Sequence, residues 1–356
     1  MILRLAWLAA ALWLASGDLS AAEAFPADHE HLRFTGRIGQ PGSTEPLLSW
    51  PGNAVTLRFT GSELAVRLDD RRGANFFSVF LDGDTLQPVV LDLEPGEQRY
   101  VVATGLAEGE HTAVIYRRTE GWEGAVRFLG VELAEGGQLL PPPPPPDRRI
   151  EYYGDSITSG MAVDAGMYAG DQDAADKNAF HSYASIAARA LDAEAHLVSL
   201  SGIGLLVSGF PFTMEAYHRQ RLGSGRNSSR WDFAEFRPQV VVINLGQNDK
   251  WNLGRLKPVP GGDDIVQAYV DFMATLRGHH PDALIVLALG SMDASGDDSD
   301  WPGYIEQAVA RFSEAHDDRA GHVIFEFTGY RKHPRLAQQQ ANAQQLVALI
   351  RERLGW

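Results

Sequence analysis

The sequence contains no cysteine in its 356 residues. That absence excludes thiolate nucleophiles, zinc sites built on thiolates and iron–sulfur clusters. Positive charge is scarce, since 31 Lys and Arg oppose 46 Asp and Glu and leave a formal net charge of −15. Because such a surface repels a phosphate backbone, we expect no nucleic-acid partner. The remaining composition, with 44% hydrophobic and 22% charged residues, is typical of a globular protein, and the length allows two domains.

The sequence also lacks an apolar run long enough to span a bilayer, which takes about 20 residues. Leu5–Ala15, the apolar run that follows Arg4, covers only 11 residues. Ala22-Glu23-Ala24 then forms a small-x-small cleavage pattern, so residues 1–24 are predicted to be a secretory signal peptide. We therefore expect an exported protein, secreted or periplasmic, without membrane insertion. A buried or anchoring helix is the alternative interpretation.

Short segments in which apolar residues alternate with polar ones extend from about residue 33 to 135, and turn residues separate them. This pattern predicts an antiparallel β-sandwich, jelly-roll or similar, over residues 25–140. The residues expected to face its core are Val55, Leu57 and Phe59; Leu64, Val66 and Leu68; Phe76 and Phe80; and Val114 and Tyr116.

Six consecutive prolines, Pro141–Pro146, begin a stiff linker over residues 141–149. A ligand for proline-binding modules is the alternative role. Residues 150–356 then alternate strand and helix patterns, which predicts an α/β domain with a doubly wound parallel sheet. Ligands of such sheets bind at the carboxyl ends of the strands. The predicted strands are 150–153, 196–200, 240–245, 284–289 and 322–327, and the predicted helices are 182–192, 264–278, 302–316 and 336–353.

The first predicted strand is followed by Gly154-Asp155-Ser156-Ile157. A serine on a tight turn at a strand's carboxyl end is placed as an exposed nucleophile, although Ser156 could also serve only as a helix N-cap. A nucleophilic serine needs a base. His333 lies just past the fifth strand and can take a proton near neutral pH, so its position distinguishes it from the other histidines.

Hydrogen-bond donors follow the next two strands, in Ser201-Gly202-Ile203-Gly204 and Gly246-Gln247-Asn248-Asp249. With the N–H of Ser156, the N–H of Gly202 and the side chain of Asn248 supply three donors for the oxyanion of a tetrahedral intermediate. Each turn alone is also explained by the preference of Gly and Asn for positive φ. Their occurrence at successive strand ends favours a shared site.

The motifs GDSI, SGIG, GQND and a late HP, in this order, resemble the four blocks of the SGNH (GDSL-like) hydrolase superfamily. With a β-sandwich in front, the chain is most similar to carbohydrate esterase family two. Acetyl xylan esterases of this family pair a jelly-roll domain with an SGNH domain and remove O-acetyl groups from plant polysaccharides. The resemblance implies that Ser156 is the nucleophile, that His333 is the base, and that Ser156, Gly202 and Asn248 form the oxyanion hole. Gly204 could replace Gly202, and neither a metal nor an organic cofactor is implied.

The sequence departs from the superfamily three residues before the histidine, where an aspartate usually orients the imidazole and Tyr330 stands here. Members of family two manage with a Ser-His dyad whose ring is held by a backbone carbonyl, so the departure fits the narrower resemblance. Asp293, after the fourth strand, is the only distant carboxylate that we consider as an orienting group. Loss of activity is the alternative interpretation.

Trp251 and Trp301 follow the third and fourth strands and could stack on a sugar ring, although ordinary packing explains them equally well. Trp122 is a weaker candidate for the same role. The acidic segment 293–300 lacks the spacing of a calcium loop, which favours a solvated loop. Residues 160–177 are expected to form a long loop that shapes access to the nucleophile.

The sequence thus predicts an exported serine esterase that removes O-acetyl groups from polysaccharides or oligosaccharides of the xylan or glucomannan type, through an acetyl-serine intermediate. The rival functions are an SGNH lipase, arylesterase or thioesterase, and a carbohydrate-binding protein that has kept the cleft without turnover. The sequence does not specify the polysaccharide, the hydroxyl position or the oligomeric state.

Overall fold

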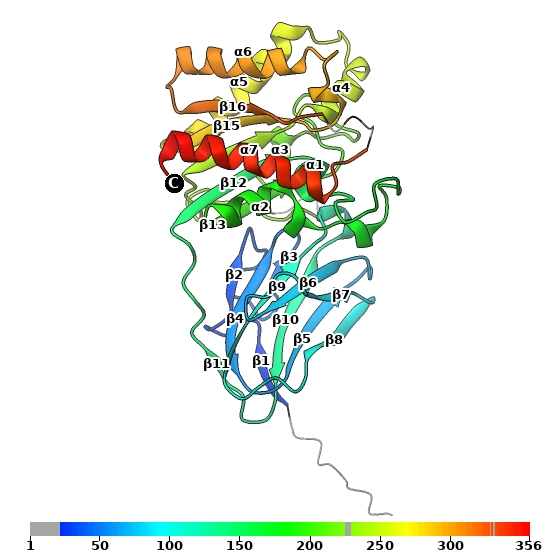
Figure 1. Cartoon of the computed structure of the whole chain (residues 1–356), viewed down its shortest axis with the longest axis vertical. Coiled ribbons are helices and arrows are strands. Elements are labelled where there is room, and N and C mark those ends of the chain that lie inside the picture. The colour runs from blue at the N-terminus through cyan, green and yellow to red at the C-terminus, as the bar shows by residue number, and fades with distance from the viewer. Residues whose placement is uncertain (1–21, 225–228, 328, 330–331) are drawn as a thin grey trace, which may run out of the picture.

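The computed structural model describes residues 22–224, 229–327, 329 and 332–356. They form an all-β domain and an α/β domain stacked end to end (Figure 1). Residues 1–21 of the predicted signal peptide lie outside the described residues, whereas Glu23 already belongs to the first strand. Among the helices that the structure describes, none is long and apolar enough to cross a membrane.

The all-β domain consists of two antiparallel sheets packed face to face. Its strands are β1 (Glu23–Pro26), β2 (Arg33–Thr35), β3 (Leu47–Leu48), β4 (Ala54–Thr60), β5 (Leu64–Asp70), β6 (Phe76–Leu81), β7 (Val89–Asp92), β8 (Gly96–Ala103), β9 (Glu110–Arg117), β10 (Val126–Leu133) and β11 (Leu139–Leu140). One sheet has the order β1-β10-β5-β8 with β3 beside β10, and the other has the order β11-β4-β9-β6-β7 with β2 beside β4. As predicted, β4 and β5 direct Leu57 and Val66 into the core between the sheets.

The core-facing residues predicted for β6 and β9 are wrong by one position. The side chains in the sandwich core are Phe77, Val79, Ala113 and Ile115, rather than Phe76, Phe80, Val114 and Tyr116. Phe80 instead stacks on Phe180 of the α/β domain with ring centroids 4.2 Å apart, and Tyr116 forms a 2.9 Å hydrogen bond with Ser185. Because these strands are covered on both faces, apolar residues occupy both alternating sets and the pattern does not distinguish the faces.

The α/β domain contains a parallel sheet with helices on both faces. Its strands are β12 (Arg148–Gly154), β13 (Ala193–Ser199), β14 (Val240–Asn244), β15 (Leu284–Leu289) and β16 (Ala320–Ile324), and its helices are α1 (Ser156–Ser159), α2 (Tyr183–Ala190), α3 (Met214–Tyr217), α4 (Gln247–Asn252), α5 (Gly262–His279), α6 (Trp301–Ala315) and α7 (Leu336–Leu354). Each predicted strand and helix overlaps one of these elements. Residues 141–146 form neither helix nor strand and lie between β11 and β12. Short 3-10 helices are η1 (Gly121–Glu123), η2 (Ala174–Asp176), η3 (Ala179–His181), η4 (Leu253–Arg255) and η5 (Asp293–Ser295).

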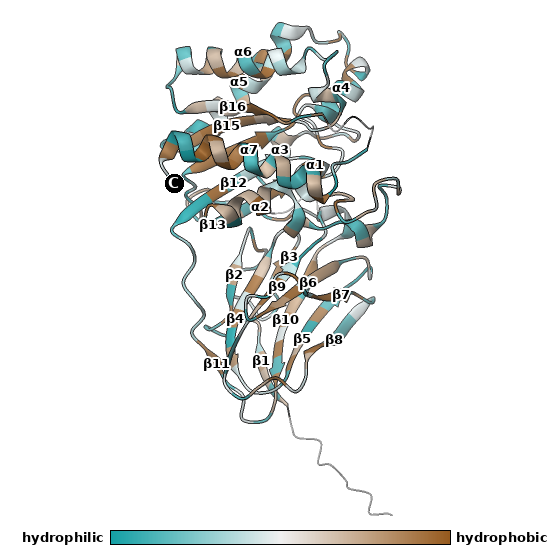
Figure 2. Cartoon of the chain, viewed as in Figure 1, coloured by the Kyte–Doolittle hydropathy of each residue, from teal (hydrophilic) through white to brown (hydrophobic). Residues whose placement is uncertain are grey.

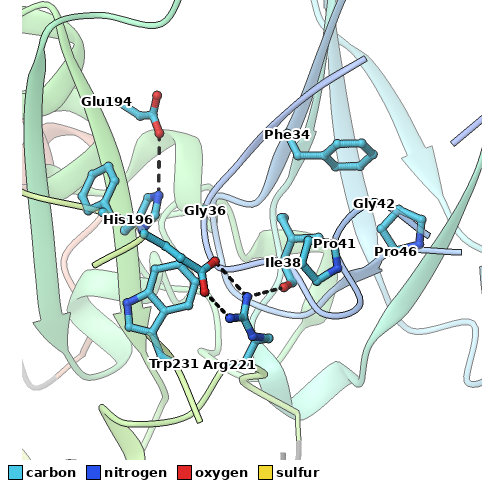
Figure 3. A pocket seen from close by; sticks show the side chains of 12 residues that line it. Phe34, Gly36, Ile38, Pro41, Gly42, Pro46, Glu194, His196, Arg221 and Trp231 are labelled. Atoms are coloured by element: carbon cyan, nitrogen blue, oxygen red, sulfur yellow. Dashed lines mark hydrogen bonds and ion pairs between the residues drawn. The ribbon is translucent and has the colours of Figure 1, made fainter. Parts of the chain in front are cut away.

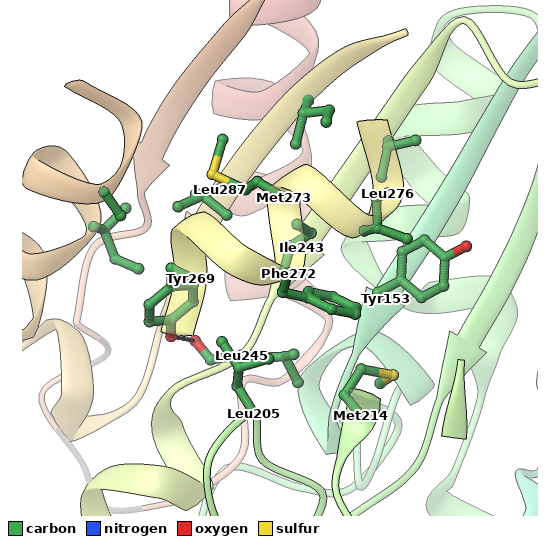
Figure 4. Close-up of a cluster of buried hydrophobic side chains, with 14 of the residues drawn as sticks. Tyr153, Leu205, Met214, Ile243, Leu245, Tyr269, Phe272, Met273, Leu276 and Leu287 are labelled. Carbon is green, nitrogen blue, oxygen red and sulfur yellow. Dashed lines mark hydrogen bonds between the residues drawn. The ribbon is translucent and has the colours of Figure 1, made fainter. Parts of the chain in front are cut away.

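The strand order β13-β12-β14-β15-β16 places a topological switch point between β12 and β14. Helices α5 and α6 cover one face of this sheet, and α2 and α7 cover the other. On the first face Tyr269, Phe272 and Met273 of α5 pack over Ile243 and Leu287 (Figure 4). Strand β15 is accordingly apolar along its whole length (Figure 2), and β14 is apolar up to Asn244, as burial on both faces requires. The motifs GDSI and GQND follow the two strands at this switch point, which is where sheets of this kind bind ligands.

A buried ion pair joins the two domains. Arg37, from the segment after β2, is 1% exposed, and its Nη2 lies 2.8 Å from Oε1 of the fully buried Glu151 on β12. Tyr153 and His280 also contact the Glu151 carboxylate, and the guanidinium lies 4.9 Å from the ring centroid of Trp231. Burial acts to raise the pKa of Glu151, but the Arg37 charge and the other contacts outweigh burial and hold this pKa well below its usual range.

Replacing Arg37 with methionine should lower the free energy of unfolding by about 3–5 kcal/mol, because Glu151 would stay buried without its cation. Urea denaturation followed by circular dichroism measures this change. Arg33→Met is the matched control. Arg33 is partly exposed and lies 3.9 Å from Glu194, so its loss should cost less than about 1 kcal/mol. Equal losses in the two variants would contradict the anchoring role of Arg37.

Candidate active site

Ser156 stands on a tight turn at the carboxyl end of β12, as predicted for the nucleophile. The N-cap of α1 is Asp155, whose Oδ1 accepts a 2.9 Å hydrogen bond from the N–H of Ile157, so capping is not the role of Ser156. Gly154 is required by close packing, because a Cβ there would lie 2.0 Å from the Thr158 hydroxyl oxygen. The turn therefore presents Ser156 at the switch point.

His333 lies between β16 and α7, and its side chain reaches back to Ser156. Its Nε2 is 2.8 Å from Oγ of Ser156. This is hydrogen-bond distance, which transfer of the serine proton to the imidazole requires. The structure thus brings together two side chains that are 177 residues apart in the chain.

The other ring nitrogen of His333 is held by a carboxylate that the sequence analysis missed. Nδ1 lies 2.9 Å from Oδ2 of Asp171, which also accepts a 3.1 Å hydrogen bond from the backbone N–H of His333. Arg335 donates to the second oxygen, Oδ1, at 2.8 Å. Burial acts to raise the pKa of Asp171, but the hydrogen bonds from His333 and Arg335 outweigh it and hold the pKa well below its usual range. An ionised carboxylate on Nδ1 favours the tautomer whose Nε2 lone pair faces the serine.

This contact corrects the expectation about the orienting group. Asp293, the carboxylate considered from the sequence, instead contacts Gln247, Lys250 and Trp251. Tyr330 lies outside the described residues. Asp171 belongs to the 160–177 loop, 162 residues before the histidine, and no motif spacing points to it. The one available signal was its place in a long loop directly after the nucleophile turn.

The predicted oxyanion donors lie at the ends of β12, β13 and β14. Among the described residues, neither the N–H of Ser156 nor that of Gly202 has a protein acceptor. The N–H of Gly204 instead donates to Oγ of Ser208 at 3.0 Å. A Cβ on Gly204 would lie 2.2 Å from the Val207 carbonyl oxygen, so packing explains that glycine. The geometry favours Gly202 over Gly204 as the donor.

Asn248 is fixed directly beside the nucleophile turn. Its Nδ2 donates to Oδ2 of Asp155 at 3.0 Å and to the Ile203 carbonyl at 2.9 Å, so both amide hydrogens have protein acceptors in this structure. An oxyanion bound here would share one of these two amide hydrogens with its present acceptor. Burial raises the pKa of Asp155 to about 7, and the nearby Asp249 charge adds to this shift.

The three tryptophans considered from the sequence occupy different environments. Trp251 is 53% exposed, and its indole N–H donates to Oδ1 of Asp293 at 2.9 Å, so its ring is both accessible and held. Trp122 is also partly exposed and donates to the Ser201 carbonyl at 2.9 Å. Trp301 is 5% exposed and packs in the core. This burial corrects the expectation for Trp301, because a ring so enclosed offers no face to a sugar.

Two other places do not contribute to this site. A pocket at the domain junction, lined by His196, Arg221 and Trp231 among others (Figure 3), includes none of the residues of the candidate active site. Within the part of the chain that the structure describes, no cluster of three or more His, Asp or Glu side chains is arranged to hold a metal ion.

The comparisons with known families match both domains. Residues 34–143 match the family described as "Carbohydrate esterase 2 N-terminal", and residues 152–352 match the "GDSL-like Lipase/Acylhydrolase family". The latter match covers the parallel sheet, the nucleophile turn and the late histidine. Fold and site together define a carboxylic ester hydrolase of the SGNH type.

Individual relatives extend over nearly the whole chain. It is 33% identical over 92% of its length to cellulase/esterase CelE of Acetivibrio thermocellus, but spans only 40% of that protein. It is 27% identical, over 95% of this chain and 93% of the other, to an acetylxylan esterase / glucomannan deacetylase of Cellvibrio japonicus. The structure of a family two carbohydrate esterase from Clostridium thermocellum, in complex with cellohexaose, aligns with a TM-score of 0.82 and 32% identity over 91% of this chain and 99% of that one. The chain belongs to carbohydrate esterase family two, which confirms the resemblance and the fold class predicted from the sequence.

Replacing Asp171 with asparagine should change stability in a pH-dependent way. Below the ordinary aspartate pKa of 3.8 the unfolded chain protonates Asp171 while the folded chain does not, so the wild type loses this stabilisation as the pH falls. The stability deficit of Asp171→Asn should therefore be largest near pH 6 and shrink by pH 3. Urea denaturation at both pH values measures it.

Ser156→Ala, which leaves Asp171 in place, serves as the control. Its difference from the wild type in the free energy of unfolding should stay the same between pH 6 and pH 3. A deficit of Asp171→Asn that stays constant or grows toward pH 3 would contradict the cause assigned to the pKa shift.

Proposed function

We propose that this esterase removes O-acetyl groups from polysaccharides or oligosaccharides of the xylan or glucomannan type, through an acetyl-serine intermediate. The observation that carries the proposal is the continuous contact from Asp171 through His333 to Ser156. Beside it lie the N–H groups of Ser156 and Gly202, which have no protein acceptor among the described residues. The substrate class is supported by the relatives, one of which is named for acetylxylan and glucomannan.

The geometry supports acyl transfer in two halves. Oγ of Ser156 attacks the acetyl carbonyl carbon as its proton moves to Nε2 of His333, and the carbonyl oxygen becomes an oxyanion. The N–H groups of Ser156 and Gly202, with the Asn248 amide, stabilise this charge. The sugar oxygen then leaves with the proton from His333, which produces acetyl-Ser156. In the second half His333 takes a proton from water, the hydroxide attacks the acetyl group, and acetate leaves as Ser156 regains its proton.

Trp251 is our proposal for a sugar-contacting residue. Its indole is half exposed and is held by Asp293, and it lies on helix α4, which also carries Asn248. A ring fixed in this way loses little conformational entropy on binding, and the C–H face of a sugar packs well on it.

Export and the domain limits are also proposals. A signal peptide over residues 1–24 is supported by Arg4, the apolar run Leu5–Ala15 and the small residues before residue 25. The limits 25–140, 141–149 and 150–356 are supported by the change from antiparallel to parallel sheets across the proline segment.

The first test is acetate release from acetylated xylan, acetylated glucomannan and 4-nitrophenyl acetate. Wild-type protein should release acetate from the polysaccharides, and Ser156→Ala should lower kcat by a factor of about 10⁴ or more, because the nucleophile is gone. Activity on 4-nitrophenyl acetate alone would refute the polysaccharide substrate and favour another acyl ester. No release from any ester by a folded wild type would indicate a protein that only binds carbohydrate.

The role of Asp171 predicts a second effect on turnover. Asp171→Asn should lower kcat by a factor of about 10²–10⁴, because the amide cannot hold the imidazole in the productive tautomer or stabilise its charged form. Steady-state kinetics on 4-nitrophenyl acetate measure this loss. Asp173→Asn is the matched control, since Asp173 belongs to the same loop but caps η2 and does not face the histidine. A similar loss in both variants would indicate a loop defect instead.

A further inference from the structure

A loop of the all-β domain contacts the turn Ser201–Gly204 of the α/β domain. This turn carries the proposed donor Gly202 and is called the oxyanion turn below. The loop is the segment Thr119–Gly124, which contains η1 and is called the junction loop below. Its Glu120 is 1% exposed. Oε2 of Glu120 accepts a 2.5 Å hydrogen bond from the N–H of Ser201, and Oε1 accepts one of the same length from the Ser201 hydroxyl. Ser201 directly precedes Gly202, the proposed oxyanion donor.

The carbonyl of Ser201 is held by the same loop. The indole N–H of Trp122 donates to this oxygen at 2.9 Å. The Ser201 carbonyl and the Gly202 N–H belong to one planar trans peptide, so they point in opposite directions. The hydrogen bond to the Ser201 carbonyl oxygen therefore also fixes the direction of the Gly202 N–H. The backbone N–H, hydroxyl and carbonyl of Ser201 are thus all bound by residues of the other domain.

The negative charge of Glu120 is balanced inside the junction. Nζ of Lys177, a buried residue at the end of the 160–177 loop, lies 3.0 Å from Glu120 and 2.5 Å from Glu123. Burial acts to lower the pKa of Lys177, but the two carboxylates outweigh burial and leave this pKa above its usual value. Because an unpaired buried charge is costly, the contact with Lys177 stabilises the Glu120 side chain in its buried position next to Ser201.

The loop that carries Asp171 is anchored to the all-β domain by Arg118, the residue directly before the junction loop. Arg118 donates to the carbonyls of Ala175 and Lys177, and its Nη2 lies 2.9 Å from Oδ2 of Asp164. Two loop segments of the site therefore contact the all-β domain: the turn Ser201–Gly204 and the 160–177 loop, called the carboxylate loop below because it carries Asp171.

We propose that Glu120 and Trp122 of the all-β domain are positioning residues for the oxyanion hole, and that they aim the Gly202 N–H by holding Ser201. This inference rests on the proposed acyl-transfer function. It makes the hydrolase site incomplete without the other domain, although no residue of the all-β domain takes part in proton transfer.

The test uses the full chain and steady-state kinetics with 4-nitrophenyl acetate. Glu120→Ala and Trp122→Phe should each lower kcat by a factor of about 10–100, short of the loss expected for deleting a donor, with KM changed less than about threefold. Trp122→Phe removes the hydrogen bond to Ser201 but keeps an aromatic ring. If Trp122 only contacted substrate, this variant would leave kcat unchanged, and any effect would be a rise in KM. Glu120→Gln retains an acceptor for the Ser201 N–H and should recover most of the activity lost in Glu120→Ala.

Glu123→Gln is the matched control. Glu123 shares Lys177 with Glu120 but does not contact Ser201, so this variant should lower kcat much less than Glu120→Ala. Wild-type kcat in folded Glu120→Ala and Trp122→Phe, a change in KM alone, or equal losses in Glu120→Ala and Glu123→Gln would each overturn the inference. If Glu120→Ala does not fold, Trp122→Phe decides the question, and wild-type kcat in that variant overturns it.

A second assay separates this inference from the substrate assignment. A fluorophosphonate labels Ser156 by forming an O–P bond as fluoride leaves, and its phosphoryl oxygen needs the same donors as an acetyl oxyanion. Slower labelling of Trp122→Phe and Glu120→Ala than of Glu123→Gln supports the inference. This holds even if the wild type releases no acetate from polysaccharides, because that result would refute only the substrate assignment. Equal labelling rates overturn the inference, and a wild type that neither hydrolyses esters nor labels overturns both.

Discussion

Charged side chains are buried in the junction between the two domains, and each finds its partner across that junction. Arg37 of the all-β domain forms an ion pair with Glu151 of strand β12, and Glu120 forms one with Lys177. Removing one partner of such a pair leaves an uncompensated charge in a low-dielectric interior, which costs several kcal/mol. The requirement that these charges be paired restricts the two domains to one relative placement. The solved esterase from Clostridium thermocellum, which aligns over 91% of this chain with a TM-score of 0.82, has a similar overall arrangement.

The active site depends on that placement because much of it lies on loops rather than on the sheet. The turn Gly154–Ser156 is positioned by strand β12 and by the close packing of Gly154 against Thr158. The carboxylate that holds His333 lies on the 160–177 loop, where Arg335 fixes its second oxygen. Loops have few internal contacts to define them, so they need external anchors. The all-β domain supplies these anchors to the carboxylate loop through Arg118 and to the oxyanion turn through the junction loop.

Much of the fold and part of the site could be predicted from sequence because the signals were local. The parallel strands are short apolar runs between helical patterns, and Ser156, Asn248 and His333 follow strand ends, which must meet at one edge of a sheet. Asp171 could not be predicted in the same way. It has no fixed spacing from His333, and its carboxylate reaches the ring only because a long loop folds back toward α7.

The sequence by itself determined the two-domain layout, the family and the side chains proposed for nucleophile and base, because periodicity and strand-end motifs depend on neighbouring residues. Tertiary structure alone decided which faces of β6 and β9 lie in the sandwich core, that Trp301 is buried, that Asp171 contacts His333 and that Glu120 contacts Ser201. The physical reason is that alternation of apolar and polar residues shows that one face of a strand is buried, but does not identify the residues that cover it. Likewise, a carboxylate acquires its partner only when distant segments are brought within hydrogen-bond distance.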